Sequence, residues 1–296
     1  MSQDVARIVR HPRGRATVDG VVSFGDRLRA ALEAHGPLCV GIDPHEHLLR
    51  EWSLPVNAQG VREFGLRVVA AATGRVGVVK PQVAFFERFG AAGFTALEEV
   101  LRAARDAELI VIADAKRGDI GSTMAGYAAA WLDEGSPLEA DAVTLSPYLG
   151  PDSLDETFAY ARERGKGVFV LAATSNPEAG ELQRAVGASG SVAADVARAV
   201  RAFAVAPGLH DLGLVIGATV DRSTFGLSDD ALADVPILAP GFGAQGAEPA
   251  DLGRLFGALA GNVVASESRS ILSAGPEGLA ARIEQRRALY PEARHG

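Results

Sequence analysis

Eight short apolar runs, separated by longer amphipathic segments, constrain the fold of this chain more than any other feature. The runs cover residues 38–43, 76–80, 109–114, 142–146, 168–173, 214–218, 237–240 and 262–266. Each run is a nearly continuous series of Val, Ile, Leu and Ala, which is typical of strands that are buried on both faces of a parallel sheet. Helix-like periodicity lies between them, for example over 61–73, 94–107, 153–164, 194–205 and 252–259.

This alternation of strands and helices predicts an α/β fold. Eight repeats favour a closed (β/α)8 TIM barrel, whose usual length is ~250 residues. The alternative, an open doubly wound sheet, would need a glycine-rich first turn that cradles phosphate. Here the first strand instead runs into Gly41-Ile42-Asp43-Pro44. No linker rich in Pro, Gly or Ser divides the chain, so residues 23–296 are predicted to form a single barrel domain.

The N-terminal residues 1–22 differ from the rest, because they carry several arginines and no apolar periodicity. We expect them to form a flexible extension. They lack the apolar core of a secretory signal, and the chain has no apolar run of 18 residues, so no membrane contact is predicted. The formal charge of −8 argues against nucleic-acid binding. The single cysteine, Cys39, lies inside an apolar run, which fits a core position and a reducing, cytoplasmic setting.

Charged residues stand at the ends of several predicted strands, where barrel enzymes carry their chemistry. Lys80 ends the second strand, and Asp114 and Lys116 follow the third, with Asp119 three residues further on. Asp114 and Lys116 are two residues apart and would share one face of an extended strand. Charges that point into a barrel must be paired. Only three of the 29 basic residues are lysines, and two of these three, Lys80 and Lys116, stand at predicted strand ends.

A phosphate site is predicted after the last two strands, where such barrels often bind phosphate. The glycines at 241, 243 and 246 would let backbone N–H groups approach an anion. Arg269 follows the eighth strand and could bind the same phosphate through its guanidinium group.

A metal site is a weaker reading of the sequence. His45 and His47 follow the first strand, where some metal-dependent barrel hydrolases place a histidine pair. The later strand ends lack the further histidines that such sites need. We therefore expect both to be solvated loop residues, and no metal to be bound.

The polar residues at the strand ends resemble a known family. Asp114-x-Lys116-x-x-Asp119-Ile120 resembles the D-x-K-x-x-D-I signature of orotidine 5′-phosphate decarboxylases. Further segments resemble the longer bacterial subgroup of that family, in the same order along residues 23–273. They are Gly41–Pro44, Lys80–Gln82, Ala173–Pro177, Pro240–Gly246 and Ser268–Ile271.

The resemblance implies a reaction: decarboxylation of orotidine 5′-monophosphate to UMP, the last step of pyrimidine nucleotide synthesis, without metal or cofactor. It implies that Lys116 protonates C6 of the pyrimidine and that Asp114 faces the substrate carboxylate. It further implies that Lys80 and Asp119 complete a Lys-Asp-Lys-Asp charge network. Its working unit would be a homodimer with shared active sites, in which Asp119 is donated across the interface.

The resemblance also implies a set of substrate contacts. Asp43 would touch the ribose, and either Ser175 or Asn176 would meet the pyrimidine amide. Ile120 and Thr123 would accompany Asp119 across the dimer interface. Gly243, Gln245 and Arg269 would hold the phosphate.

Two other functions compete with this one. A Mg²⁺-dependent sugar-phosphate decarboxylase or aldolase of the same barrel group shares the D-x-K-x-x-D strand, but usually has an acid where this chain has Lys80. A non-catalytic nucleotide-binding barrel would not need the intact set of charged residues. Lys166 has no role in any of these readings, and we expect arginine to replace it harmlessly.

Overall fold

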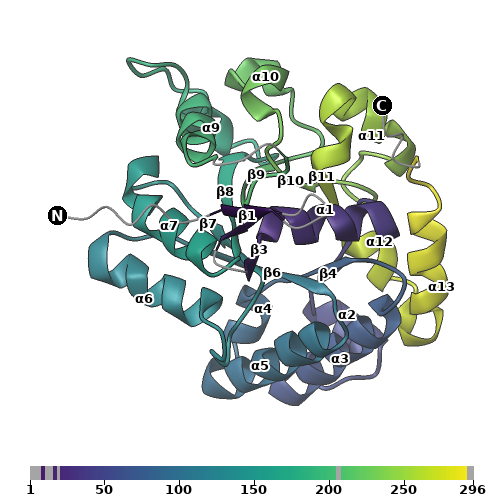
Figure 1. Ribbon diagram of the computed structural model, residues 1–296. Helices are drawn as coiled ribbons and strands as arrows, with labels where there is room; N and C mark the ends of the chain where they lie inside the picture. The colour runs from purple at the N-terminus through teal and green to yellow at the C-terminus, as the bar shows by residue number, and fades with distance from the viewer. Residues whose placement is uncertain (1–7, 11–15, 19–20, 205–207, 292–296) are drawn as a thin grey trace.

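The strands close into one parallel barrel, as the sequence predicts. The computed structural model describes residues 8–10, 16–18, 21–204 and 208–291. The barrel strands are β4 (Leu38–Ile42), β5 (Val78–Pro81), β6 (Ile110–Arg117), β7 (Ala142–Leu145), β8 (Gly167–Ala173), β9 (Leu212–Ile216), β10 (Ile237–Pro240) and β11 (Val263–Glu267). Each is hydrogen-bonded to its neighbour in chain order, and β11 returns to β4, which closes the barrel (Figure 1).

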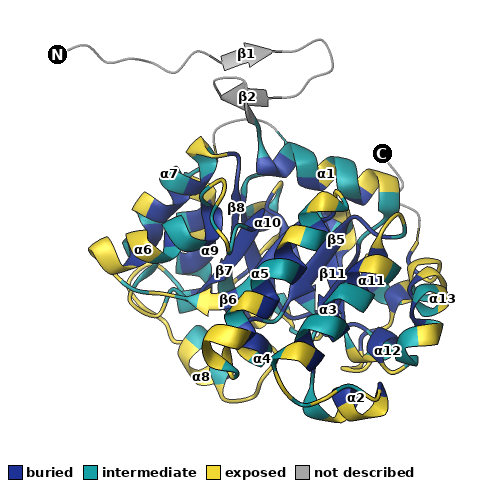
Figure 2. Cartoon of the chain, turned by 90° about the horizontal axis from the view of Figure 1, so that it is seen from below, coloured by how far each residue is buried: buried dark blue, intermediate teal, exposed yellow. Residues whose placement is uncertain are grey.

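Helices surround this barrel and bury one face against it. They are α1 (Phe24–His35), α2 (Glu46–Glu51), α3 (Ala58–Ala72), α4 (Ala84–Glu87), α5 (Gly90–Asp106), α6 (Gly121–Leu132), α7 (Asp155–Glu163), α8 (Ala179–Gln183), α9 (Val192–Ala202), α10 (Asp229–Leu232), α11 (Leu252–Phe256), α12 (Arg269–Leu272) and α13 (Gly275–Arg287). In Figure 2 the barrel strands are mostly buried, apart from the exposed end of β6, and the helices expose their outer faces. A large apolar cluster fills the layer between strands and helices.

The predicted and observed elements differ where local geometry intervenes. The predicted helix over 252–259 ends at Phe256, because Gly257 turns to a φ of +55° and a 3₁₀ segment, Gly257–Asn262, follows. The predicted helix over 153–164 starts as a 3₁₀ turn, Pro151–Leu154, before α7. The third strand does not stop at Asp114 but continues to Arg117.

The inside of the barrel separates into an apolar end and a polar end. Side chains that point inward alternate along each strand with those that point outward. At the amino ends of the strands the inward residues form a second apolar cluster, which includes Cys39, Val78, Ile112 and Ala142. Two residues further along three of these strands stand Lys80, Asp114 and Thr144. The polar site therefore lies on top of a packed apolar floor.

Helix α1 covers the apolar end of the barrel (Figures 1 and 2). Phe24, Leu28 and Leu32 on one face of α1 belong to the same apolar cluster as the strand interiors. The Phe24 ring meets Phe169 of β8 edge to face, with 6.1 Å between ring centroids. A Cβ at Gly167 would lie 2.3 Å from the Phe24 ring, so only glycine leaves room for this contact.

Residues ahead of α1 form a small separate sheet in the described segments. Strands β1 (Ile8–Arg10), β2 (Ala16–Val18) and β3 (Val21–Val22) pair in antiparallel fashion. The remainder of the extension predicted over 1–22 lies outside the described residues, so its flexibility stays a prediction. Across the described part of the chain, no helix has the length and apolar character needed to cross a bilayer.

Candidate active site

The centre of the site is a carboxylate between two lysines. Lys80 Nζ lies 2.9 Å from Asp114 Oδ2, and Lys116 Nζ lies 2.5 Å from Asp114 Oδ1. Lys80 and Asp114 are almost fully buried, whereas 44% of the Lys116 side chain is exposed. One ammonium group is thus fixed inside the barrel and the other faces the opening, where a substrate could reach it.

Two further residues complete the hydrogen bonding of Asp114. Thr144 on β7 donates its hydroxyl to Oδ1 over 3.0 Å. The Gln82 side-chain amide, with its nitrogen turned toward Asp114, lies 2.9 Å from Oδ2. Each carboxylate oxygen therefore accepts two hydrogen bonds, which uses the acceptor capacity of an ionised aspartate. Sequence reasoning assigned no role to Thr144 or Gln82, although a threonine inside the apolar run of β7 is a signal that could have found one of them.

Lys116 reaches Asp114 through an unusual backbone conformation. Its φ is +49°, and the pairing of β6 with β7 shifts register between Ala113 and Arg117. A left-handed φ is costly for a residue with a side chain and is concentrated at functional sites. The prediction that Asp114 and Lys116 share one face is right in outcome, but a bulge and not a plain extended strand produces it.

Neighbouring charges stabilise the ionised forms of the two buried groups, Asp114 and Lys80. Burial alone would raise the pKa of Asp114, but the ammonium groups of Lys80 and Lys116 hold that pKa well below its usual range. Burial alone would lower the pKa of Lys80, but Asp114 and Asp43 raise that pKa above its ordinary value. The buried ammonium group of Lys80 is therefore charged at neutral pH.

Asp43 follows β4, and its negative charge contributes to the raised pKa of Lys80. Within the described residues, Asp43 Oδ1 is buried and has no hydrogen-bond partner, and the same holds for Ser268 Oγ after β11. Because β4 pairs with β11, both atoms belong to the polar end of the barrel. Buried polar atoms normally have partners, so these two are candidates for binding a ligand.

Asp119 is not joined to this cluster within the chain. Its Oδ1 accepts the backbone N–H of Ile120, and among the described ion pairs none links it to Lys80 or Lys116. Ile120 has 60% of its surface exposed, and Thr123 is exposed on the first turn of α6. The structure thus brings together three members of the expected charge network and leaves the fourth apart, beside an exposed apolar side chain.

Ser175 and Asn176 stand in the exposed loop after β8. A Cβ added to Gly217 after β9 would lie 3.2 Å from Ser175 Cβ, so the Ser175 side chain lies over the end of the neighbouring strand. Asn176 is engaged with its own loop, since it accepts from Thr174 Oγ1 over 2.7 Å and donates to Glu178. Among the described hydrogen bonds, the Asn176 side chain is thus engaged and the Ser175 hydroxyl is not.

The predicted phosphate residues occupy two adjacent segments at the polar end of the barrel. Residues 241–246, here called the phosphate loop, follow β10, and three glycines in it adopt positive φ values. Gln245 in this loop and Arg269 at the start of α12 are both exposed. A Cβ at Gly243 would lie 2.7 Å from Ser270 Cβ, so the phosphate loop rests directly on α12.

The other candidates from the sequence are less suited to catalysis. The rings of His45 and His47 lie 5.4 Å apart, and His45 packs on Phe85. Within the described residues, no three His, Cys, Asp or Glu side chains gather as metal ligands. Cys39 is fully buried, and burial raises the pKa of its thiol to about 12.

Comparison with known proteins decides the family. Residues 36–283 match the family described as "Orotidine 5'-phosphate decarboxylase / HUMPS family". The chain belongs to this family. The resemblance inferred from the strand-end motifs is thereby confirmed, as is the barrel that it implies.

Relatives at high identity narrow the assignment within the family. A Corynebacterium glutamicum protein named orotidine 5′-phosphate decarboxylase is 51% identical over 86% of this chain and 92% of its own length. A Streptomyces coelicolor protein of the same name is 52% identical over 88% of this chain and 93% of its own length. These family members carry the name of a carboxy-lyase, and the expectation that this chain is an enzyme of that class is confirmed.

Solved structures of family members have the same barrel. The crystal structure of a candidate orotidine 5′-phosphate decarboxylase from Streptomyces avermitilis matches with a TM-score of 0.86 at 48% identity, over 91% of this chain and 95% of that one. The Leishmania donovani OMP decarboxylase matches with a TM-score of 0.66 at 29% identity, over 90% of this chain and 99% of that one.

Proposed function

We propose that this protein decarboxylates orotidine 5′-monophosphate to UMP in pyrimidine nucleotide synthesis, without a metal ion or an organic cofactor. The observation that carries the proposal is the Lys80–Asp114–Lys116 cluster at the polar end of the barrel, in a chain about half identical to proteins named for this reaction. An acid at position 80 would suit a Mg²⁺-dependent sugar-phosphate enzyme, whereas this chain has a buried lysine there.

Lys116 is the proposed proton donor to C6. Loss of CO₂ leaves negative charge on this carbon, and no carbonyl group is placed to delocalise it. An ammonium group beside C6 stabilises that charge more in the transition state than in the ground state. Lysine can also deliver the proton, which arginine essentially cannot. The exposure of the Lys116 side chain toward the opening allows a bound pyrimidine to meet it.

Asp114 has two proposed effects. It keeps the buried Lys80 charged and fixes the position of both lysines, because each of its oxygens is held by one ammonium group and one neutral donor. It would also face the carboxylate of the substrate, a repulsion that disappears when CO₂ leaves. The four hydrogen bonds prevent Asp114 from turning away to relieve that repulsion.

The phosphate loop and Arg269 are the proposed binding site for the 5′-phosphate. The glycines of the loop expose backbone N–H groups, and the guanidinium of Arg269 offers a bidentate contact. Gln245 would add an amide donor. The buried Oδ1 of Asp43 would accept from a ribose hydroxyl, which satisfies an atom without a partner among the described residues. Binding energy from these remote groups can be used to organise the reacting ring.

A homodimer with shared sites is part of the proposal. The turn after β6 lies against the turn after β7, where a Cβ at Gly118 would approach Ser146 O to 2.4 Å. Ile120, Tyr148 and Leu149 on these turns are exposed apolar side chains. Such a patch is typical of protein interfaces. Asp119 stands beside it and is available to the active site of a second copy. The cytoplasmic setting stays a prediction.

One assay tests the proposed function. Purified protein is mixed with orotidine 5′-monophosphate, and the loss of orotidylate absorbance and the formation of UMP are followed. We expect turnover that EDTA does not reduce. Absence of turnover would reject the reaction, and inhibition by EDTA that Mg²⁺ reverses would reject the metal-free mechanism. Binding of UMP without any turnover would favour the non-catalytic barrel.

A further inference from the structure

We propose that Glu267 is a positioning residue that holds the phosphate loop and α12 in the geometry that binds the substrate phosphate. The proposal deepens the proposed function and rests on it, because that function assigns the phosphate to these two segments. Glu267 is the last residue of β11 and stands two residues before Arg269. The expected signature of the family did not include it.

The Glu267 carboxylate is buried, and three donors hold it: Ser270 on α12, Arg286 on α13 and Tyr290 just after α13. Its side chain is fully excluded from solvent. Oε2 accepts from Ser270 Oγ over 2.5 Å and from Arg286 Nε over 2.7 Å, while Oε1 accepts from Tyr290 Oη over 2.7 Å. A buried carboxylate is tolerated only when it is paired and hydrogen-bonded, so these contacts define one arrangement of the three partners.

The phosphate loop rests on this carboxylate. A Cβ at Gly243 would lie 2.8 Å from Glu267 Oε2, which leaves room only for glycine at this point, and the φ of Gly243 is +69°. The preceding residue, Phe242, packs its ring against the Tyr290 ring at 5.8 Å and 65°. The same two side chains, Glu267 and Tyr290, therefore support consecutive residues of the loop.

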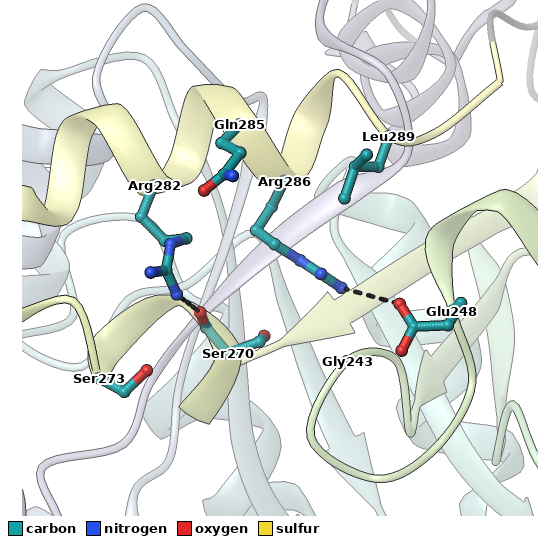
Figure 3. A pocket seen from close by; sticks show the side chains of 8 residues that line it. All are labelled: Gly243, Glu248, Ser270, Ser273, Arg282, Gln285, Arg286 and Leu289. Atoms are coloured by element: carbon teal, nitrogen blue, oxygen red, sulfur yellow. Dashed lines mark hydrogen bonds and ion pairs between the residues drawn. The ribbon is translucent and has the colours of Figure 1, made fainter.

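Helix α12 is fixed by the same network at the residue after Arg269. The hydroxyl of Ser270 donates to Glu267, and the carbonyl oxygen of Ser270 accepts from Arg282 Nη1 over 2.8 Å. In Figure 3, Arg282 and Arg286 extend from α13 toward α12 and the loop that carries Gly243. The two arginines line a pocket of about 320 Å³ with Ser270, Gly243 and Glu248.

Charge balance explains why the acidic Glu267 can lie so close to a phosphate site. An unpaired carboxylate there would repel the phosphate, but Arg286 neutralises Glu267 directly. Arg286 also lies 3.9 Å from Glu248, so Arg282 and Arg286 together balance Glu248 and Glu267. The network therefore fixes the backbone of both phosphate-binding segments without adding net charge. A ligand phosphate would meet a preorganised cradle, which lowers the ordering cost of binding.

The test compares Glu267→Gln and Ser270→Ala with the unchanged protein. Both variants loosen the network, and Ser270→Ala removes only one hydroxyl, so it keeps the proposal testable if Glu267→Gln fails to fold. Arg269→Ala is the reference for a lost phosphate contact. Glu139→Gln is the matched control, because Glu139 also pairs with a buried cation, Lys166, but just ahead of β7 at the apolar end of the barrel.

Two measurements are made on each protein. Calorimetry gives the Kd of UMP and of uridine, which lacks the phosphate, and steady-state kinetics gives KM and kcat for orotidine 5′-monophosphate. We expect Glu267→Gln and Ser270→Ala to weaken UMP binding and raise KM by roughly tenfold, with uridine binding changed by less than about twofold. Glu139→Gln should lower Tm and leave UMP binding unchanged.

Hydrogen exchange supplies a readout that does not depend on the reaction. Peptides covering the phosphate loop should exchange roughly tenfold faster in Glu267→Gln and Ser270→Ala, and at the original rate in Glu139→Gln. Unchanged loop exchange together with unchanged or tighter UMP binding overturns the proposal, as does an equal loss of UMP and uridine binding. If the unchanged protein shows no turnover, the proposed function fails, and loop exchange still decides whether Glu267 holds the loop.

Discussion

The backbone N–H of Lys116 donates to the hydroxyl of Thr144 over 2.9 Å. The same hydroxyl donates to Asp114 Oδ1, so Thr144 holds both the backbone of Lys116 and the carboxylate that its ammonium group meets. This contact ties the left-handed residue of β6 to β7 and fixes where the ammonium group points. Thr144 therefore holds the backbone of Lys116 in place as well as the carboxylate to which its ammonium group binds.

The proton-donor role of Lys116 is tested by Lys116→Arg and Lys116→Ala. Arginine keeps the positive charge but cannot release a proton at neutral pH. We expect both variants to lose nearly all turnover while UMP binding persists, because neither change touches the proposed phosphate contacts. Rapid turnover by Lys116→Arg would contradict proton transfer. Since the side chain is partly exposed, Tm should change little.

Asp114→Asn should destabilise the fold as well as abolish turnover. The variant leaves the buried Lys80 ammonium beside Lys116 without the carboxylate between them. Breaking a buried ion pair costs about 3–5 kcal/mol, and denaturant unfolding at pH 7 measures the loss. An unfolding free energy equal to that of the unchanged protein would show that the pair contributes no stability.

The contribution of Asp114 to stability should depend on pH in a defined direction. Its pKa is depressed in the folded state, so the unfolded chain binds the proton more tightly. The stabilisation is complete above the unfolded pKa of about 3.9 and is lost as pH falls through the lower folded pKa. The difference in unfolding free energy between the protein and Asp114→Asn should therefore persist from pH 7 to pH 5 and shrink below pH 4. A difference that already disappears at pH 5 would contradict the depressed pKa.

Mixing inactive subunits tests the role of Asp119. Asp119→Ala and Lys116→Ala should each be inactive alone. Random mixing into dimers would restore roughly a quarter of the original activity, because half of the dimers contain one intact site out of two. Activity is measured after denaturation and joint refolding, and mass spectrometry verifies the mixed dimers. No recovery in proven mixed dimers would place Asp119 outside the partner's site.

The reactivity of the Cys39 thiol should depend on unfolding of the protein, and this thiol should have no role in catalysis. Alkylation needs an exposed thiolate, whereas this thiol is buried and burial raises its pKa to about 12. We expect no reaction with iodoacetamide at pH 8 while the protein is folded, and complete reaction after denaturation. Mass spectrometry counts the modified fraction. Loss of turnover on alkylation of the folded protein would give Cys39 a role that the structure does not support.

Lys166→Arg should not be harmless, contrary to the expectation from the sequence. Lys166 is buried, and its ammonium group lies 2.8 Å from Glu139 Oε1. A larger guanidinium group in this packed place should cost about 1–3 kcal/mol of stability. Thermal unfolding measures the effect, and Arg102→Lys on the exposed face of α5 is the matched control. Equal Tm values for the two variants would restore the original expectation.

The sequence was sufficient to predict the barrel, because the apolar pattern of a buried strand recurs in each of the eight runs. The eight apolar runs predict eight buried strands, and the alternation within a strand puts Lys80 and Asp114 on the inside at the same end. Contacts made across strands carry a weaker signal, because only the polar Thr144 within an apolar run points to one of them. Thr144 and Gln82 complete the hydrogen bonding of the Asp114 carboxylate from neighbouring strands. Nothing in the sequence distinguishes Glu267 from other acidic residues at strand ends.

Other features depend on geometry that local sequence does not encode. The left-handed conformation of Lys116 arises from the register shift between β6 and β7. The burial of Lys166 arises from the packing of the segments that precede β7 and β8. The proposed role of Asp119 needs a second copy of the chain, so a single sequence supports that role only through the family motif.

The helix across the apolar end of the barrel has a consequence for the order of folding. α1 leaves the ribosome before any barrel strand, yet its apolar cluster draws on strands as late as β10 and β11, through Leu238 and Val264. Its backbone is held by Asp211, which accepts the Gly25 N–H over 2.8 Å. Among the described elements, α1 is therefore made before all the strands on which it packs, and its full docking surface exists only once β10 and β11 have joined the barrel.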